Sequence, residues 1–233
     1  MKIKFYQTTP LAKLFPPVPC AKVIPHWYKK MDAEVSNVQK LAFANNLSVK
    51  RCVPVLDYMT SGYIIKNYTD ILVKKSWSDE NGEELSLDFK QVGDQSPVDF
   101  HSASQMPLEI NNHKKKIGKF TGVWGIETPP GYSCLFYQPE YLREERFKIF
   151  PGIVDTDQYT DPIGFPFVFN NKYKTEEYVI EAGTPIACVL PFKREKWTHE
   201  ILEHDKDNKT SILMQTIWNN AYRRFMHSKK EYK

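Results

Sequence analysis

The sequence predicts a mainly β fold, a distorted antiparallel barrel or sandwich with short helices. Short apolar segments follow one another from residue 120 to residue 192, separated by turns that contain proline and glycine. Aromatic residues make up 14% of the chain, and tyrosine and phenylalanine favour strands. The 16 prolines interrupt the sequence so often that few helices can run for long.

Alternating side chains identify one strand with particular clarity. Phe165, Phe167 and Phe169 are two residues apart, which in an extended chain places their three rings on one face. We therefore expect these rings in the core. Further strands are expected at residues 63–65, 120–128, 132–137, 147–154, 163–170, 178–180 and 186–190.

A hairpin is predicted earlier in the chain. Asn81-Gly82 lies between two strand-like segments, residues 71–78 and 84–91. Asparagine and glycine tolerate the positive φ angles of a type I′ turn, so the pair predicts a tight two-residue connection.

We expect a single domain over residues 1–233 with four parts. They are a proline-rich N-terminal arm (1–33), a helical insertion (34–61), a β core (62–192) and a C-terminal helical extension (193–233). An apolar stripe with a period of 3.6 residues predicts an amphipathic C-terminal helix. The stripe consists of Met214, Ile217, Trp218, Ala221, Tyr222 and Phe225.

Charge and cysteine usage narrow the functional classes. The net charge of +4 permits an acidic partner without requiring one. No apolar stretch reaches the length of a membrane span, so no membrane partner is expected. The four cysteines form no CxxC pair, and reduced, buried thiols are expected. We predict a cytoplasmic location in a host cell, or a place in a virion assembled there.

Two carboxylates form the strongest candidate for chemistry. Asp155 and Asp157 are two residues apart after an apolar segment, so in an extended chain they point the same way. Such a pair can hold a water for general-base catalysis or bind Mg²⁺. The structural alternative is an aspartate-rich turn. Without such an activity we expect no cofactor, and the six histidines show no zinc-ligand spacing.

Three segments resemble one enzyme superfamily. Residues 125–132 (Gly-Ile-Glu-Thr-Pro-Pro-Gly-Tyr), residues 150–159 (Phe-Pro-Gly-Ile-Val-Asp-Thr-Asp-Gln-Tyr) and residues 180–190 occur in the order of the trimeric dUTP pyrophosphatases and dCTP deaminases. The resemblance covers residues 120–192. It implies a β-clip fold, which is a distorted, mostly antiparallel barrel, often assembled as a trimer.

The resemblance also implies roles for individual residues. Asp155 would orient the attacking water, and Tyr159 would lie under the base. The family's Arg-Ser-Ser phosphate motif should fall near Gln138, where this sequence has no such motif. Arg143 and Arg146 are the nearby basic residues that could contact a substrate.

A second likeness is to proteins of tailed phages, and it implies a phage-encoded protein. It rests on Pro25-His-Trp-Tyr-Lys29 and on Cys52-x-Pro-x-x-Asp57. Cys52 and Asp57 with a distant histidine would make a nucleophile site, which the local sequence does not support.

Three functional hypotheses follow. The first is a non-enzymatic binding or structural protein whose β core contacts partners or other copies. The second is a divergent nucleotide-hydrolysing enzyme that uses Asp155, with Mg²⁺ on Asp155 and Asp157. The third is a basic nucleic-acid accessory protein, based on the three lysines at 114–116 and the basic C-terminal helix. A close trio of both aspartates and a basic side chain in an open cleft would favour the enzyme.

Overall fold

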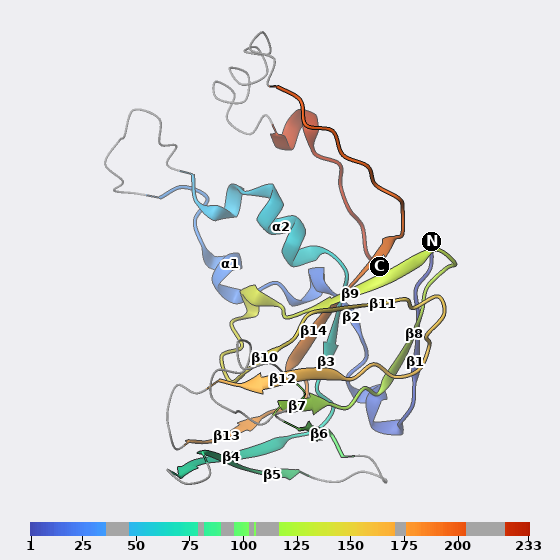
Figure 1. The fold of residues 1–233 in the computed structure, drawn as a ribbon. Coiled ribbons are helices and arrows are strands. Elements are labelled where there is room, and N and C mark those ends of the chain that lie inside the picture. The colour runs from blue at the N-terminus through green and yellow to red at the C-terminus, as the bar shows by residue number, and fades with distance from the viewer. Residues whose placement is uncertain are drawn as a thin grey trace. The chain divides into compact units, whose positions relative to one another are not determined.

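The computed structural model describes residues 1–35, 47–78, 82–89, 96–102, 105, 117–170, 176–203 and 222–233. These residues form two compact units, residues 1–18 with 62–194 and residues 19–61 with 195–233. The first unit consists mainly of antiparallel sheets, so the predicted fold class is confirmed (Figure 1). The described strands do not close into a barrel. The single-domain organisation stays a prediction.

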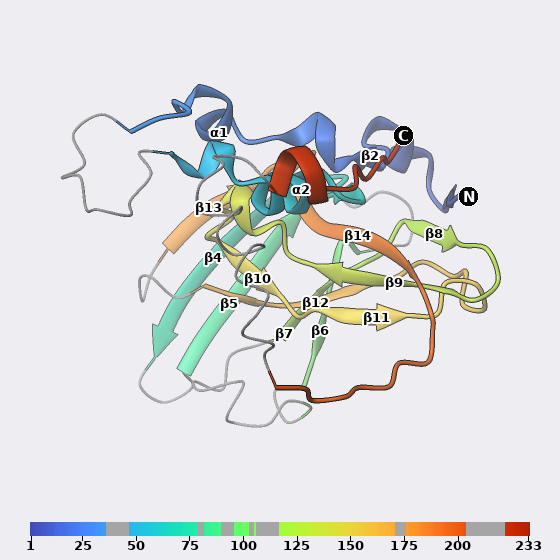
Figure 2. The ribbon, with the colours of Figure 1, turned by 90° about the horizontal axis from the view of Figure 1, so that it is seen from above.

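A five-stranded sheet is the centre of the first unit. Its order is β11 (Gly152–Val154), β9 (Tyr132–Tyr137), β14 (Pro185–Lys193), β3 (Tyr63–Lys66) and β2 (Val18–Pro19). Figure 2 shows β14, β9 and β11 side by side, and the pairs β11–β9 and β9–β14 are antiparallel. Cys134, Phe136 and Val189 face the core and are at most 3% exposed. Gly62, with φ +78°, directly precedes β3, and a Cβ there would lie 2.2 Å from the Val189 carbonyl oxygen.

A cluster of aromatic side chains packs on one face of a four-stranded antiparallel sheet. The strand order is β10 (Phe147–Ile149), β12 (Phe165–Phe169), β7 (Ile117–Phe120) and β6 (Val98–His101). Phe165, Phe167 and Phe169 are buried, which confirms the alternation. The Phe167 ring stacks on Phe120 with centroids 4.1 Å apart and meets Phe169 edge-on at 4.8 Å. Offset and edge-on ring pairs add stability beyond the area they bury.

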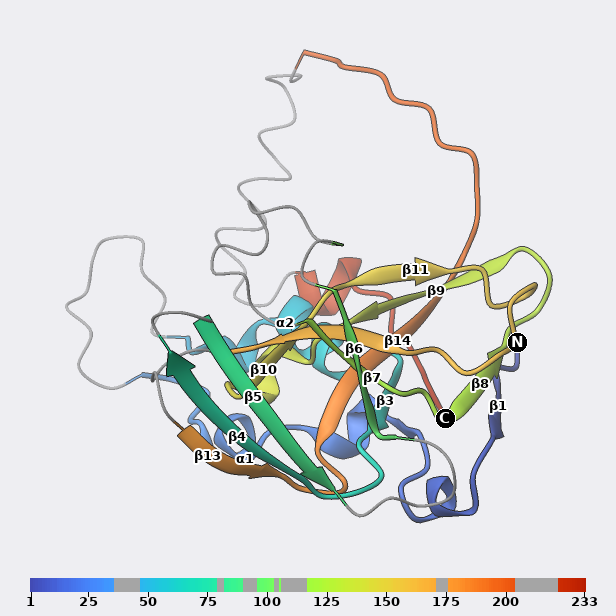
Figure 3. The ribbon, with the colours of Figure 1, turned by 60° about the horizontal axis from the view of Figure 1, so that its bottom comes forward.

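The predicted hairpin forms, but its turn differs. β4 (Ile71–Ser78) pairs with β5 (Gly82–Phe89), and β13 (Glu176–Ile180) pairs with the other side of β4 (Figure 3). Ser78 is opposite Gly82, which places Gly82 inside a strand rather than in a two-residue turn. The type I′ prediction is therefore wrong, because three residues connect the strands. These residues, 79–81, lie outside the described part of the chain.

Two predicted strands are each divided. Residues 120–128 form the end of β7 and a separate β8 (Trp124–Glu127), which pairs with β1 (Lys4–Gln7) of the N-terminal arm. Gly122 lies at the break, where a Cβ would be 2.2 Å from the Ile163 carbonyl oxygen. Residues 147–154 form β10 and β11, which belong to different sheets. Pro151 lies between them and has no N–H for a ladder.

Short helical elements complete both units. The first unit contains the 3₁₀ turns η1 (Pro10–Leu14) and η5 (Glu140–Leu142). The second contains η2 (Cys20–Val23), α1 (His26–Lys30), η3 (Val49–Arg51), α2 (Val53–Thr60) and the π-helical turn η6 (Tyr222–Met226). Most of the predicted C-terminal helix lies outside the described residues. None of the described helices has the length and apolar character that crossing a bilayer requires. All four cysteines are thiols, as expected.

The aromatic cluster leads to a stability prediction. Phe167→Ala should lower the free energy of unfolding by about 3–5 kcal/mol, because it leaves a cavity among packed rings. Urea unfolding monitored by circular dichroism measures the change. Leu14→Ala is the control, since Leu14 is 68% exposed, and it should change stability by less than about 0.5 kcal/mol. Equal effects of the two substitutions would contradict this assignment of the core.

Candidate functional site

The two aspartates lie together with an arginine that the sequence analysis did not identify. Arg194 follows β14 directly, and its Nη1 is 2.9 Å from Asp157 Oδ1 and 3.2 Å from Asp155 Oδ1. Its Nη2 donates to the second Asp157 oxygen, Oδ2. The guanidinium therefore binds Asp157 through both nitrogens, the strongest geometry for an ion pair of this kind.

Strand register brings these residues together. Val154 is opposite Cys134, so the next position, Asp155, lies beside Ser133, whose hydroxyl donates to Asp155 Oδ1 at 2.6 Å. The sheet also brings the end of β14 beside the start of β9, where the Arg194 N–H donates to the Gly131 carbonyl at 2.8 Å. The site is thus assembled by non-local pairing of β11, β9 and β14.

Asp157 fixes the turn at residues 129–131. The Gly131 N–H donates to Asp157 Oδ2 at 2.7 Å, and Gly131 has the positive φ of +84° that suits glycine. Hydrogen bonds from Arg194, and then from the Gly131 N–H, hold the pKa of Asp157 down to about 2. The Asp157 side chain is only 6% exposed. Asp157 is therefore a permanently ionised anchor at neutral pH.

Asp155 differs from Asp157 in its exposure. Its side chain is 56% exposed, although it is bonded to Ser133 and close to Arg194. Its backbone carbonyl accepts from the N–H groups of Gln158 and Tyr159 at 3.0 and 2.9 Å. These bonds form a turn, the structural alternative that the sequence offered. Asp155 is the carboxylate of the pair that faces solvent.

Thr156 points away from both aspartates. It is fully buried, its hydroxyl lies 2.8 Å from that of Thr128, and it donates to Cys134 Sγ at 3.3 Å. Burial raises the pKa of the Cys134 thiol, so this group stays protonated. Both aspartates meet Arg194, although residues 156–158 form a turn and not the extended segment that the sequence spacing assumed.

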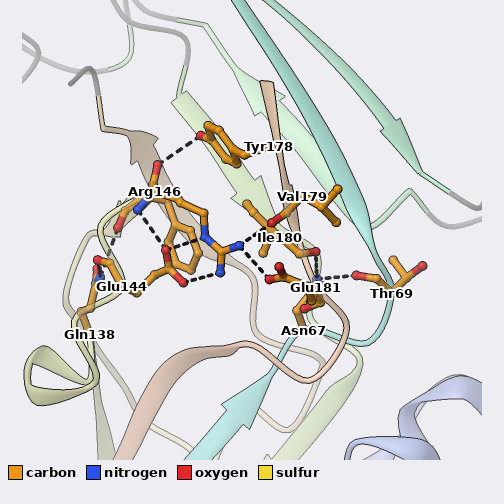
Figure 4. A network of polar contacts seen from close by, with 10 residues as sticks. Asn67, Thr69, Gln138, Glu144, Arg146, Tyr178, Val179, Ile180 and Glu181 are labelled. Carbon is orange, nitrogen blue, oxygen red and sulfur yellow. Dashed lines mark hydrogen bonds and ion pairs between the residues drawn. The ribbon is translucent and has the colours of Figure 1, made fainter. Parts of the chain in front are cut away.

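Arg146 belongs to a second polar network (Figure 4). Its Nε and Nη2 donate to the two Glu144 carboxylate oxygens, each at 2.8 Å, and its Nη1 donates to Glu181 at 2.7 Å. Nη1 also donates to the Val179 carbonyl, and the Arg146 carbonyl accepts from Tyr178 Oη at 3.3 Å. Glu144 is the main cause of the raised pKa of Arg146. The guanidinium joins the segment before β10 to β13.

Gln138 is at the position where a phosphate motif would be expected, and its side chain is bound to backbone. Its Nε2 donates to the carbonyls of Glu144 and Phe147 at 3.2 and 3.1 Å, and its Oε1 accepts from the Ile149 N–H at 2.9 Å. Gln138 is 9% exposed. It stabilises the path of the chain into β10.

The other two predicted contacts lie at the surface. Arg143 is exposed and ends η5 with φ 56°, the left-handed conformation. Tyr159 is 48% exposed and lies in the turn after Asp155. Their roles in substrate binding stay predictions.

Comparison with known proteins adds a distant likeness in fold. No protein-family model matches the chain, and no curated protein matches its sequence. A mutant dUTPase from phage phi11 of S. aureus, described for its coordination of a structural Mg(II) ion, aligns with 12% identity and a TM-score of 0.39. The alignment covers 88% of this chain and 98% of that one. A mutant dUTPase of Staphylococcus bacteriophage 80alpha with dUpNHpp aligns with 12% identity and a TM-score of 0.36, covering 88% and 90%.

The Asp157 anchor leads to a prediction about acid stability. A carboxyl with a pKa of about 2 when folded, against an ordinary value of 3.8, stabilises the fold above pH 4. This contribution disappears as the pH falls from about 4 to about 2. Asp157→Asn should therefore be less stable at pH 7 and should lose less of its remaining stability between pH 4 and pH 2.

Urea unfolding at pH 7, 4, 3 and 2 measures both effects. Asp161→Asn is the control, because Asp161 is an exposed aspartate near the same turn. If Asp157→Asn and the unmodified chain lose the same amount of unfolding free energy between pH 4 and pH 2, Asp157 is not the anchor.

Proposed function

We propose that this chain is a non-catalytic binding protein that acts by associating with other copies of itself through the first unit. The observation that supports the proposal is that the charged groups of the candidate site are already bonded to other groups of the same chain. Arg194 and Gly131 occupy the Asp157 carboxylate, while Glu144 and Glu181 occupy the Arg146 guanidinium. A hydrolase would need these groups for substrate, water or metal.

The same contacts argue against a magnesium site at the aspartate pair. Both Asp157 oxygens accept bonds from the Arg194 cation, and a metal ion would have to displace that cation. Magnesium needs near-ideal octahedral geometry and is bound through one or two carboxylates. Because Arg194 already holds both Asp157 oxygens, the pair does not fit Mg²⁺, and we derive no metal-dependent step.

An apolar surface lies beside this anchor. Ile153 on β11 is opposite Leu135 on β9, and Leu135 is opposite Leu190 on β14. Directly opposed residues share a face of the sheet, so the three side chains form one row. Leu135 and Leu190 are half-buried and Ile153 is exposed, in contrast to Cys134 and Val189 on the inner face.

β11 also ends the strand order of its sheet within the described part of the chain. An outer strand presents unpaired backbone N–H and C=O groups that another strand can bond. Two copies of β11 related by a two-fold axis would pair antiparallel and bring their apolar rows together. Self-association would bury Ile153 and give hydrogen-bond partners to the free backbone N–H and C=O groups of β11.

Light scattering after size-exclusion chromatography tests self-association. The unmodified chain should elute at a multiple of the monomer mass. Ile153→Asp should shift it to the monomer, because the substitution buries an unpaired charge in the interface. Ile201→Asp is the matched control, since Ile201 is 90% exposed and lies in the second unit. A chain that is monomeric at all concentrations would contradict the proposal.

A nucleotide-hydrolysing enzyme is the second candidate, and the exposed Asp155 next to Arg194 favours it. Titration calorimetry with deoxynucleoside triphosphates, with and without Mg²⁺, separates the two. We expect no saturable heat that depends on Asp155, because the groups near Gln138 and Arg146 that would bind phosphate are bonded within the fold. Saturable binding that is lost in Asp155→Asn and kept in Asp161→Asn would favour the enzyme.

Nucleic-acid binding stays a prediction. The three lysines at 114–116 and most of the C-terminal helix lie outside the described residues. The cytoplasmic or virion location likewise stays a prediction.

A further inference from the structure

The second unit contains a cavity of about 550 Å³ that the proposed function does not use. One wall is formed by α2, which contributes Val53 and Leu56, together with Ala21 from η2. The C-terminal segment, residues 222–233, forms the other wall, and Figure 1 shows it in red near α2. Cavities of this volume accommodate small organic ligands.

An aspartate on α2 holds the C-terminal segment in place. His227 Nε2 lies 3.1 and 3.0 Å from the two Asp57 oxygens, and Lys230 Nζ donates to Asp57 Oδ2 at 2.6 Å. Burial opposes ionisation of Asp57, but bonds from Lys230 and His227 outweigh it and lower the pKa of Asp57. The ionised carboxylate can only accept, so Nε2 of His227 carries the proton.

Positive charge exceeds negative charge around the cavity. Four cationic side chains line it, from Arg223, Lys229, Lys230 and Lys233, against two carboxylates, Asp57 and Glu231. Lys230 is paired with Asp57, while Lys229 and Lys233 lie 2.8 and 3.4 Å from the same Glu231 carboxylate. Arg223 is exposed. Counting lysine and arginine against aspartate and glutamate, the lining carries an excess of two positive charges.

We propose that this cavity binds a small phosphate monoester with an apolar body. The dianionic phosphate matches the excess of two positive charges, and Arg223 offers the planar fork of donors that suits phosphate. Val53, Leu56 and Ala21 provide an apolar surface for the organic part. Asp57 and Glu231 carry positive partners of their own, so their repulsion of the ligand is reduced.

Titration calorimetry of the full chain with phenyl phosphate tests the assignment. Benzoate and benzyl alcohol are the comparison ligands, since they keep the ring and carry a single negative charge or none. Phenyl phosphate should bind saturably, at least about tenfold more tightly than benzyl alcohol, because bonds to charged groups are strong. Benzoate should bind with intermediate affinity. Tighter binding of benzoate, or equal binding of all three, would overturn the phosphate assignment.

Two neighbouring arginines provide a matched pair of variants. Arg223→Gln should weaken phenyl phosphate binding at least about tenfold. Arg224→Gln makes the same change at an exposed neighbour outside the lining and should alter binding less than about twofold. Equal weakening in both variants would indicate non-specific attraction, and unchanged binding in Arg223→Gln would place the ligand elsewhere. Either result would overturn the proposal, as would the absence of saturable binding.

A second variant locates the apolar part of the ligand and does not depend on charge. Ala21 is exposed and lines the cavity, so Ala21→Phe fills space without disturbing a buried site. Binding of phenyl phosphate should be lost while the circular dichroism spectrum is unchanged. Retained binding in this folded variant would contradict the location.

Discussion

The ion pair between Asp157 and Arg194 is the contact on which the centre of the first unit depends. It joins the turn at residues 129–131, the turn after β11 and the end of β14. Asp157 accepts from three nitrogens and is almost completely shielded, so its charge is balanced inside the protein. A shielded, arginine-paired carboxylate stabilises a fold more readily than it performs catalysis, because a reacting group must reach its substrate.

A second arginine, Arg146, also pairs with carboxylates and joins distant segments of the first unit. Arg146 binds Glu144 through two nitrogens and Glu181 through a third, and Gln138 fixes the neighbouring backbone. In both places a basic residue joins segments that are far apart in the sequence. The polar groups near the presumed phosphate position therefore support the chain path, and this is why we propose binding by the apolar row on β11, β9 and β14 in preference to hydrolysis.

Local patterns in the sequence predicted the elements that depend on neighbouring residues. The two-residue spacing of Phe165, Phe167 and Phe169 identified a buried strand face, and the local pattern at Asp155 and Asp157 identified two residues that both contact Arg194. Arg194 could not be predicted in this way, because it is 37 residues from Asp157 and meets it through the register of β9 and β14. A glycine at position 122 and a proline at position 151 mark the two breaks in the sequence. The sheet that each half joins depends on distant strands, so it could not be predicted locally.

We propose that Asp157 holds the turns of the first unit together and that the aspartate pair does not hydrolyse nucleotides. Phosphorus NMR of deoxynucleoside triphosphates incubated overnight with the chain and Mg²⁺ separates this role from hydrolysis. The triphosphate signals should stay unchanged, in the unmodified chain and in Asp155→Asn alike. Release of pyrophosphate by the unmodified chain, at a rate that Asp155→Asn abolishes while the variant stays folded, would contradict it.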